Sequence, residues 1–243
     1  MNGRRLKAKR VPMKAFVAGT SMLESALFRS WERVVVPTPH GEVLLRKIDG
    51  FFFLQRHGEK MLPPHKINHL ANMWALKSLK VKKIVAINSV GSLHEKVKPG
   101  TFLIPDDFFA PCRIPTFFDA ELRFTVPHMN ESLAKRLLGF CRKVKIDARL
   151  GGVYIEAVGP RLETKAEIRF FRTVGDVVGM TLASEATLCM ELRIPYVSVC
   201  SIDNYCNGIT REPLALPEIA RNAKKSQQAL ERLVSAIIGE NGP

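Results

Sequence analysis

The sequence lacks any apolar run that approaches the ~20 residues needed to span a bilayer. Its first ten residues, MNGRRLKAKR, are basic, but no apolar segment follows them, so we expect no secretory signal. Internal repeats and low-complexity linkers are also absent. We therefore expect a cytoplasmic protein that has no membrane partner.

Cysteine is scarce and does not follow a pairing pattern. The five cysteines are an odd number, no CxxC occurs, and Cys189 and Cys200 lie in apolar segments. This usage is typical of free buried thiols in a reducing compartment. His65 and His69 lie four residues apart, but no third metal ligand accompanies them, so both are expected to be structural or surface residues. We expect no metal ion and no cofactor.

Positive charge, in contrast, is abundant. The chain has 37 Lys and Arg against 23 Asp and Glu, which gives a formal net charge of +14. Such charge can attract nucleic acid or phosphate-bearing ligands, and it is also typical of a solvated basic surface. No RNA-binding signature with interleaved aromatic residues is present, so we expect no specific nucleic-acid partner. Residues 1–13 are expected to form a flexible basic tail.

The remaining residues, 14–243, are predicted to form one α/β domain. The hydrophobic content of 46% suffices for a sizeable core. Short β-branched runs predict strands at 15–18, 33–36, 42–45, 51–55, 83–88, 101–104, 152–158, 176–180 and 196–202, of which Phe51–Phe53 should be core. Helical patterns cover 63–79, which should bury Trp74, and 131–141, a segment from 164, 185–192 and a C-terminal segment with apolar residues from 219 to 237. This order predicts a mixed central β-sheet flanked by helices.

The stretch 158–201 organises the chain. Thr164 and Glu167 have the spacing of a capping box, which predicts that a helix begins there. The buried strands at 176–180 and 196–202 are each followed by polar residues, Thr181 after the first and Asn204 after the second. Ligands of open α/β sheets bind at the carboxyl ends of strands, so we expect a site at this edge.

Seven short motifs along the chain resemble those of a known protein family. They are, in chain order, AGTS near Gly19, QRHG near Arg56, PPHKINHLANMWAL from Pro63, INSVGSL from Ile87, GPRLET from Gly159, VGMT from Val178 and NY at Asn204. With these motifs the chain resembles the trimeric purine nucleoside phosphorylase family, in its methylthioadenosine phosphorylase branch, over roughly residues 14–238. The fold implied is a nucleoside phosphorylase-like α/β domain, and the assembly implied is a homotrimer or a dimer of trimers.

The resemblance implies that inorganic phosphate is a co-substrate, held by residues of several loops: Thr20, Arg56, His57, Asn88, Ser89 and Thr181. An arginine offers phosphate oxygens a bidentate fork, and a histidine can add a donor. The first glycine usual in the family's AGTS-type loop is Ala18 here, which is a departure from the pattern.

The residues implied to contact the nucleoside are Leu162, Glu163, Met180, Asn204 and Leu216. Glu163 and Asn204 are the catalytic candidates, because they would hold the departing base. A carboxylate accepts from N1–H of a 6-oxopurine and does not suit N1 of adenine, which is itself an acceptor. The adenine-preferring relatives have an aspartate in place of Asn204 and a small hydroxyl residue in place of Glu163. Both differences predict hypoxanthine or guanine as the leaving base.

Several alternatives stay open at this point. Asp203 would be the base contact if the strand register slipped by one residue, although strand alternation predicts that it points away. Members of the family that take 5′-hydroxyl nucleosides have a histidine in the C-terminal helix region. In this chain no histidine follows His128, and the matching residues Leu214, Leu216 and Ile219 are apolar. The resemblance therefore permits a 5′-methylthio group as well as a 5′-hydroxyl.

Three other activities compete with phosphorolysis of 6-oxopurine nucleosides. They are phosphorolysis of methylthioadenosine, hydrolysis by water, and binding of nucleic acid by a catalytically idle relative. The expected reaction passes through an oxocarbenium-like sugar and requires neither a covalent nucleophile nor a metal.

Overall fold

A computed structural model describes residues 13–240 of the chain, so the predicted tail lies outside the described residues except for Met13. The strands are β1 (Lys14–Ala18), β2 (Glu32–Thr38), β3 (Gly41–Ile48), β4 (Phe51–Gln55), β5 (Lys83–Ser92), β6 (Phe102–Ile104), β7 (Asp107–Phe109), β8 (Ala148–Leu150), β9 (Val153–Glu156), β10 (Val177–Gly179) and β11 (Tyr196–Tyr205). The helices are α1 (His69–Ser78), α2 (Glu131–Lys143), α3 (Lys165–Phe171), α4 (Leu182–Glu191) and α5 (Leu216–Gly239), with short 3₁₀ turns at Thr20–Met22 and Pro64–Lys66. No helix within residues 13–240 is both long and apolar enough to cross a bilayer.

The strands form one mixed sheet, as predicted. The order β2-β3-β4-β1-β5-β10-β9-β7 runs across it, while β11 pairs with β5 and β6, and β6 pairs with β8. Strands β4, β1, β5 and β11 are mutually parallel where they pair, whereas β2, β3 and β10 add antiparallel pairs. The carboxyl ends of these parallel strands therefore meet at one edge, where a ligand site is expected.

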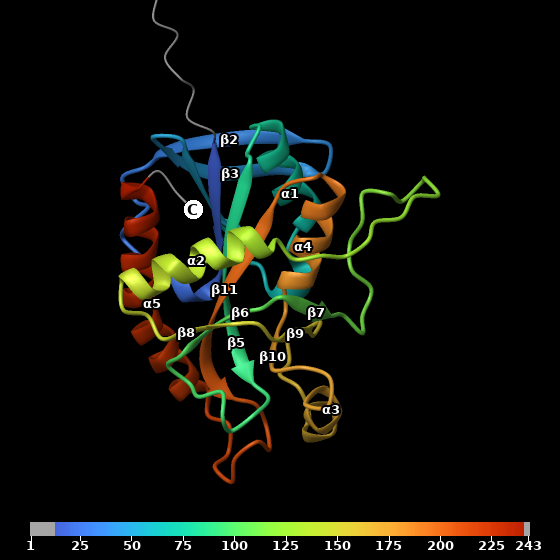
Figure 1. The fold of residues 1–243 in the computed structure, drawn as a ribbon. Helices are drawn as coiled ribbons and strands as arrows, with labels where there is room; N and C mark the ends of the chain where they lie inside the picture. Colours follow the sequence, from blue (N-terminus) through green and yellow to red (C-terminus); the bar gives the residue numbers. More distant parts are fainter. Residues whose placement is uncertain (1–12, 241–243) are drawn as a thin grey trace, which may run out of the picture.

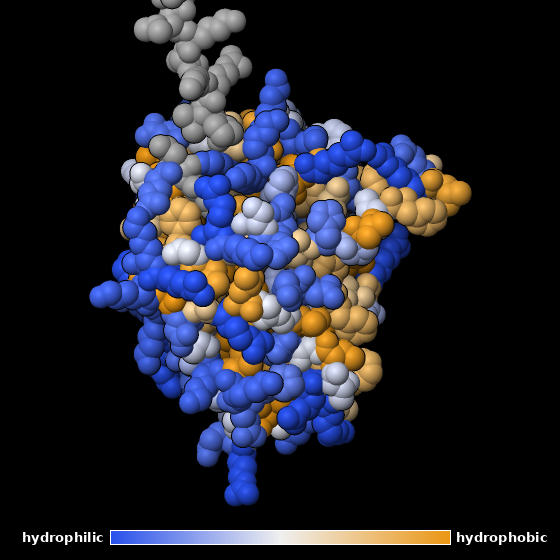
Figure 2. Space-filling model, viewed as in Figure 1, coloured by the Kyte–Doolittle hydropathy of each residue, from blue (hydrophilic) through white to orange (hydrophobic). Residues whose placement is uncertain are grey.

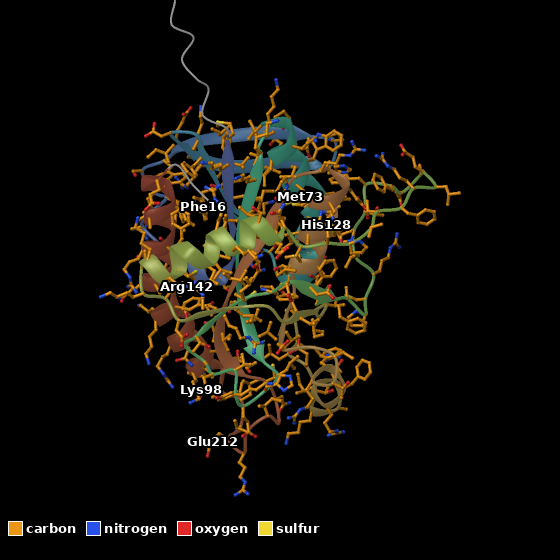
Figure 3. All side chains as sticks on the ribbon, viewed as in Figure 1. Phe16, Met73, Lys98, His128, Arg142 and Glu212 are labelled. Atoms are coloured by element: carbon orange, nitrogen blue, oxygen red, sulfur yellow. The ribbon has the colours of Figure 1, made fainter. Side chains whose placement is uncertain are left out.

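Helices cover both faces of the sheet (Figure 1). Helices α1 and α4 pack over one buried apolar cluster, which contains Met73. Helices α2 and α5 pack over a second cluster, which contains Phe16 and the predicted core residues Phe51 and Phe53. Figure 3 shows Phe16 and Met73 inside the molecule on the two sides of the central strands. Apolar packing on both faces explains why the central strands read as continuous apolar runs.

The longest parallel pairing joins β5 to β11 and carries one irregularity. The register runs from Tyr196 opposite Ile84, but it shifts between Ile202 and Asn204, so that Asn204 lies opposite Gly91. Asp203 is the extra residue of this bulge.

The prediction that Trp74 is a core residue is wrong. Helix α1 begins only at His69, where Asn68 caps it by accepting from the N–H of Ala71 at 3.0 Å. The predicted stripe therefore did not describe one continuous helix, and Trp74 is 37% exposed. Its ring lies 5.8 Å from that of Phe117, a residue of the long segment that follows β7.

That segment, residues 110–128, is called the arm; Thr116 and Phe117 hold it to Glu191 of α4, and its tip projects from the body. Figure 1 shows it as a long loop on the right, and Figure 2 shows apolar side chains at its tip. Leu122, Phe124 and Val126 are each more than four-fifths exposed. An exposed apolar group of this size is typical of an interaction site.

Candidate active site

A cavity of about 220 Å³ opens where the carboxyl ends of β1, β4, β5, β10 and β11 come together. Its wall is formed by Thr20, Arg56, His57, Pro64, Ser89, Val90, Gly91, Leu162, Glu163, Val178, Gly179, Met180, Thr181, Asn204, Cys206, Leu214 and Ile219. Nine of the eleven predicted site residues are in this wall; Asn88 and Leu216 are the two that are not. Residues separated by almost two hundred positions are thus gathered in one place.

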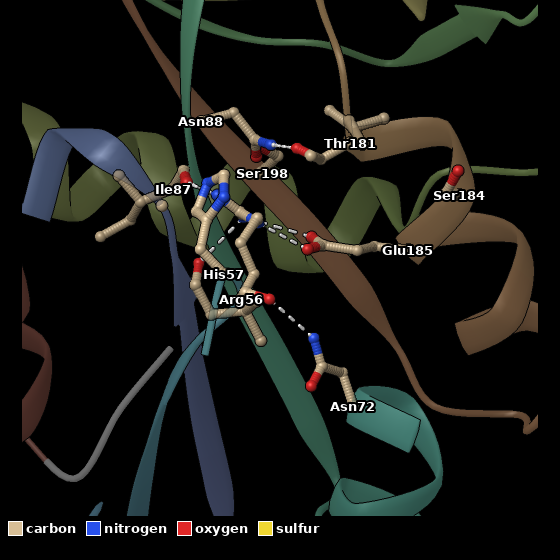
Figure 4. A network of polar contacts seen from close by, with 12 residues as sticks. Arg56, His57, Asn72, Ile87, Asn88, Thr181, Ser184, Glu185 and Ser198 are labelled. Atoms are coloured by element: carbon tan, nitrogen blue, oxygen red, sulfur yellow. Dashed lines mark hydrogen bonds and ion pairs between the residues drawn. The ribbon is translucent and has the colours of Figure 1, made fainter. Parts of the chain in front are cut away.

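Arg56 reaches the cavity from the end of β4, but its charge is already compensated. Its Nε and Nη2 donate to the carboxylate of Glu185 at 2.6 and 3.3 Å, and both side chains are buried. Nη1 donates to the carbonyl of Ile87 at 2.8 Å, and Nη2 also donates to Val17 at 3.3 Å (Figure 4). The bidentate fork predicted for a phosphate is therefore used on Glu185. Of the five guanidinium N–H groups, one on Nη1 is left for a ligand.

His57 follows Arg56 and is oriented through its other ring nitrogen. Nδ1 lies 2.7 Å from the carbonyl of Leu62, so it carries the proton of that hydrogen bond. Burial lowers the pKa of the ring, which keeps it neutral and leaves Nε2 as an acceptor. A Cβ on Gly19 would lie 2.7 Å from Arg56 Nη1 and 3.0 Å from His57 Nε2. Only glycine allows both side chains to approach the turn after β1 so closely.

Asn88, predicted to bind phosphate, lies behind the wall instead. Its Nδ2 donates to the hydroxyl of Thr181 at 2.8 Å, and its Oδ1 accepts from Ser198 at 2.6 Å (Figure 4). Asn88 is buried and supplies no atom to the cavity wall. It fixes the Thr181 side chain at the end of β10, which is a positioning role.

Glu163 and Asn204 face the same cavity from the two loops predicted to hold a base. Burial raises the pKa of the Glu163 carboxyl. Asn204 is fixed by donation from Nδ2 to the carbonyl of Tyr205 at 2.9 Å. A Cβ on Gly91 would lie 3.1 Å from Asn204 Nδ2 and 2.6 Å from Cys206 Sγ, so glycine is required opposite the bulge. The two residues give the cavity an acceptor beside an amide.

Asp203 does not line the cavity, as alternation predicted, but the reason is the bulge. Without the extra residue, Asp203 would lie opposite Gly91 and face the same side as Asn204 does now. Instead its fully buried carboxylate accepts from the hydroxyls of Ser89, Ser201 and Ser226.

Leu216, predicted to contact the nucleoside, is not part of the cavity wall. Leu216 is the first residue of α5 and is 70% exposed, because the cavity side of this segment carries Leu214 and Ile219. Sequence reasoning also missed Glu185 and Cys206. Glu185 looks like a surface residue of a short helix, and its partner is 129 residues away. Cys206 lies two residues beyond Asn204, a spacing that could have indicated it.

The residues of the cavity wall form two chemically different sets, which are called the anion end and the base end. The anion end consists of Thr20, Arg56, His57, Ser89 and Thr181. Thr20 and Thr181 provide hydroxyls and Arg56 one guanidinium N–H, whereas His57 Nε2 and, as its proton is donated elsewhere, Ser89 Oγ are acceptors. The base end consists of Glu163 and Asn204, with Met180, Leu214 and Ile219 as apolar wall. Within residues 13–240 no three His, Cys, Asp or Glu side chains are grouped as a metal ion would require. The fold and site define an α/β protein whose cavity suits an anion beside a polar heterocycle.

The chain belongs to the phosphorylase superfamily, whose family model matches residues 15–239. It is 37% identical to the probable 6-oxopurine nucleoside phosphorylase of Archaeoglobus fulgidus, over 93% of this chain and 96% of the relative. It is 38% identical to the probable S-methyl-5′-thioinosine phosphorylase of Methanocaldococcus jannaschii, over 93% and 92% of the two chains. The fold is similar to that of methylthioadenosine phosphorylase from Schistosoma mansoni in complex with adenine, with a TM-score of 0.81, 23% identity and coverage of 94% and 92%.

Proposed function

We propose that this protein cleaves the N-glycosidic bond of 6-oxopurine nucleosides with inorganic phosphate, releasing the base and a ribose 1-phosphate. The observation that carries the proposal is that Glu163 and Asn204 line the same cavity as a set of residues suited to an anion. The relatives named above as 6-oxopurine and methylthioinosine phosphorylases support it.

Phosphate bound at the anion end attacks the anomeric carbon while the ribosyl group gains positive charge. The anion itself stabilises this oxocarbenium-like sugar, and Met180 packs against it. Electrons of the broken bond pass to the purine, whose growing negative charge needs donors. Asn204 supplies an amide donor to the imidazole side or O6 of the base, and Glu163 accepts from N1–H.

The base preference follows from which groups accept and which donate. Adenine presents an acceptor at N1, which would face the carboxylate of Glu163 without a proton between them. A buried site that leaves polar groups unpaired rejects the wrong partner by about 10⁴ or more. We therefore propose hypoxanthine and guanine nucleosides as substrates in preference to adenine nucleosides.

The 5′ end of the nucleoside meets an apolar wall. Leu214, just before α5, and Ile219, in its first turn, are half-buried in the cavity wall. Within residues 13–240, α5 contributes no polar side chain to this wall. A methylthio substituent would bury its sulfur and methyl group there, so 5′-methylthioinosine is a candidate substrate beside inosine and guanosine.

The first experiment measures base release from inosine, guanosine, 5′-methylthioinosine, adenosine and 5′-methylthioadenosine, each with and without phosphate. The proposal expects hypoxanthine or guanine only when phosphate is present. Adenine as the main product would favour methylthioadenosine phosphorolysis, and release without phosphate would favour hydrolysis. Absence of turnover, together with strongly salt-dependent oligonucleotide binding, would favour the nucleic-acid alternative.

Two variants test the base end directly. In Asn204→Asp the amide donor becomes an acceptor, so we expect the ratio of inosine to adenosine turnover to fall at least tenfold. Asn130→Asp is the matched control, because Asn130 caps α2 outside the wall, where an aspartate accepts equally well. An unchanged ratio in Asn204→Asp would remove Asn204 from the base site.

We also propose that the protein acts as a homotrimer or a dimer of trimers in the cytoplasm. The exposed apolar tip of the arm supports assembly, and the five cysteines are all free thiols, which suits a reducing compartment. Replacing Leu122, Phe124 and Val126 by aspartate should reduce the mass measured by light scattering to that of a monomer. A trimer that survives these changes would exclude the arm as its interface.

A further inference from the structure

Asp203 is a buried carboxylate held only by hydroxyl groups. Its Oδ2 accepts from the hydroxyls of Ser89 and Ser201, the latter at 3.3 Å, and its Oδ1 accepts from Ser226 at 3.1 Å. The side chain is fully buried. Its main-chain carbonyl accepts from Asn222 Nδ2 at 2.8 Å, so helix α5 is bound to the bulge at two points.

No cation compensates this charge within the described part of the chain. The hydroxyls come from β5, β11 and α5, and β6 presents Phe102 and Leu103 to this part of β11. The titratable neighbour on β11 is Cys200, whose pKa burial raises to about 12, so it is neutral. Lys224 on α5 pairs at the surface with Glu24 at 3.7 Å. Burial without a cation raises the pKa of Asp203 to about 6.

Ser89 connects this carboxylate to the cavity. Its hydroxyl has one proton, and that proton is donated to Asp203. Ser89 therefore presents only lone pairs toward the anion end, although it is part of the cavity wall. A bound phosphate dianion would face these lone pairs on one side of Ser89 and the Asp203 carboxylate behind it. This arrangement is repulsive as long as Asp203 is ionised.

We propose that Asp203 is a proton-linked positioning residue, which takes up a proton when phosphate binds at the anion end. The proton comes from solvent and forms an O–H on the Asp203 carboxyl. That O–H donates to Ser89 Oγ, and the Ser89 hydroxyl turns to donate to a phosphate oxygen. The charges balance, because one proton enters for each phosphate bound. The inference rests on the proposed function, since it assigns the anion end to phosphate.

The test is calorimetric titration of phosphate without nucleoside at pH 8, in buffers of different ionisation enthalpy. The wild-type protein should take up 0.5–1 proton more per phosphate than Asp203→Asn, on the order of the single site involved. The variant mimics the protonated acid, since its Nδ2 can donate to Ser89 Oγ. Asp176→Asn is the matched control, because Asp176 lies outside the cavity wall, where it accepts from Val153 N at 3.0 Å. Proton uptake per phosphate by Asp176→Asn should equal that of the wild type.

The pH dependence of affinity gives a second readout. Between pH 7 and 8.5 the ratio of the phosphate Kd of wild type to that of Asp203→Asn should rise, by up to about tenfold per pH unit. Titration of phosphate and of His57 affects both proteins and cancels in the ratio.

Equal proton uptake and a flat ratio would overturn the inference while leaving the proposed function intact. No phosphate binding by the wild-type protein would overturn both. If Asp203→Asn does not fold, infrared difference spectra of the wild type decide instead. Phosphate should then produce the carbonyl band of a newly protonated carboxylic acid, and its absence would contradict the inference.

Discussion

The ion pair between Arg56 and Glu185 allows a stringent test of how the anion end is built. Replacing Glu185 by Leu removes the carboxylate that lies 2.6 Å from Arg56 Nε and leaves the buried guanidinium with two main-chain carbonyls. Loss of one partner of a buried pair costs about 3–5 kcal/mol. For a domain of this size, Tm should fall by roughly 6–20 °C, since each kcal/mol shifts it by about 2–4 °C.

Removing both charges should cost much less than removing either one. Arg56→Met with Glu185→Leu leaves no unpaired buried charge, and apolar replacement of a buried pair is often neutral. Tyr196 donates to Glu185 at 2.9 Å and would lose its acceptor, so the cycle is best made in a Tyr196→Phe background. We expect a coupling free energy of several kcal/mol, of the order given for buried pairs.

Urea unfolding followed by circular dichroism, in buffer without phosphate, measures the four free energies of unfolding. Added phosphate should then stabilise Glu185→Leu more than the background protein, because the uncompensated guanidinium offers the anion a full charge. Additive effects of the two single changes would refute the reasoning. Additive effects would mean that the ion pair is hydrated, or that Glu185 contributes little to the stability of the fold through Arg56.

Three further predictions concern the cavity and its surroundings. Glu156, the last residue of β9, is buried outside the cavity wall and accepts from the N–H of Ser184 at 3.1 Å. Burial raises the pKa of Glu156 to about 7 from 4.5, so the folded state binds more protons between these values and the free energy of unfolding falls as pH rises through that window. Glu156→Gln should remove ~2.5 kcal/mol of the fall between pH 5 and 8, measured by urea unfolding at the two pH values. Gly91→Ala should lower kcat/KM for the nucleoside by about 10²-fold, because its Cβ would displace Asn204 and Cys206, while phosphate Kd changes little. Ile219→Asn should favour inosine over 5′-methylthioinosine by about tenfold in competition assays, since a polar side chain replaces apolar wall.

The sequence predicted the mixed sheet correctly, and nine of the eleven predicted site residues line one cavity. The capping box at Thr164 and Glu167 is present, with both hydrogen bonds made, and α3 begins where it was predicted. The strands now labelled β5 and β11 were recognised because burial on both faces makes them apolar throughout. The strand pattern directed attention to the carboxyl ends of these strands, and the family resemblance then implied Ser89 and Asn204 as site residues. Local patterns are sufficient where a residue's position depends on one element.

Features that depend on two distant elements were not predictable in this way. Arg56 looked like a free ligand for an anion because Glu185 lies 129 residues away and is on a helix of ten residues. Asn88 looked like part of the wall because nothing in the strand predicts that Thr181 needs a partner. The register shift in β11 has no local sequence signal, since neither residue of the bulge is a glycine.

The bulge in β11 also bears on how base preference could change during evolution. Asp203 and Asn204 are neighbours, and pairing with β5 decides which of them lies opposite Gly91. Deleting Asn204 would place an aspartate opposite Gly91 in a single genetic step, and would withdraw the carboxylate from Ser89 and α5. Insertions and deletions in this strand are therefore a more abrupt route between purine specificities than substitutions.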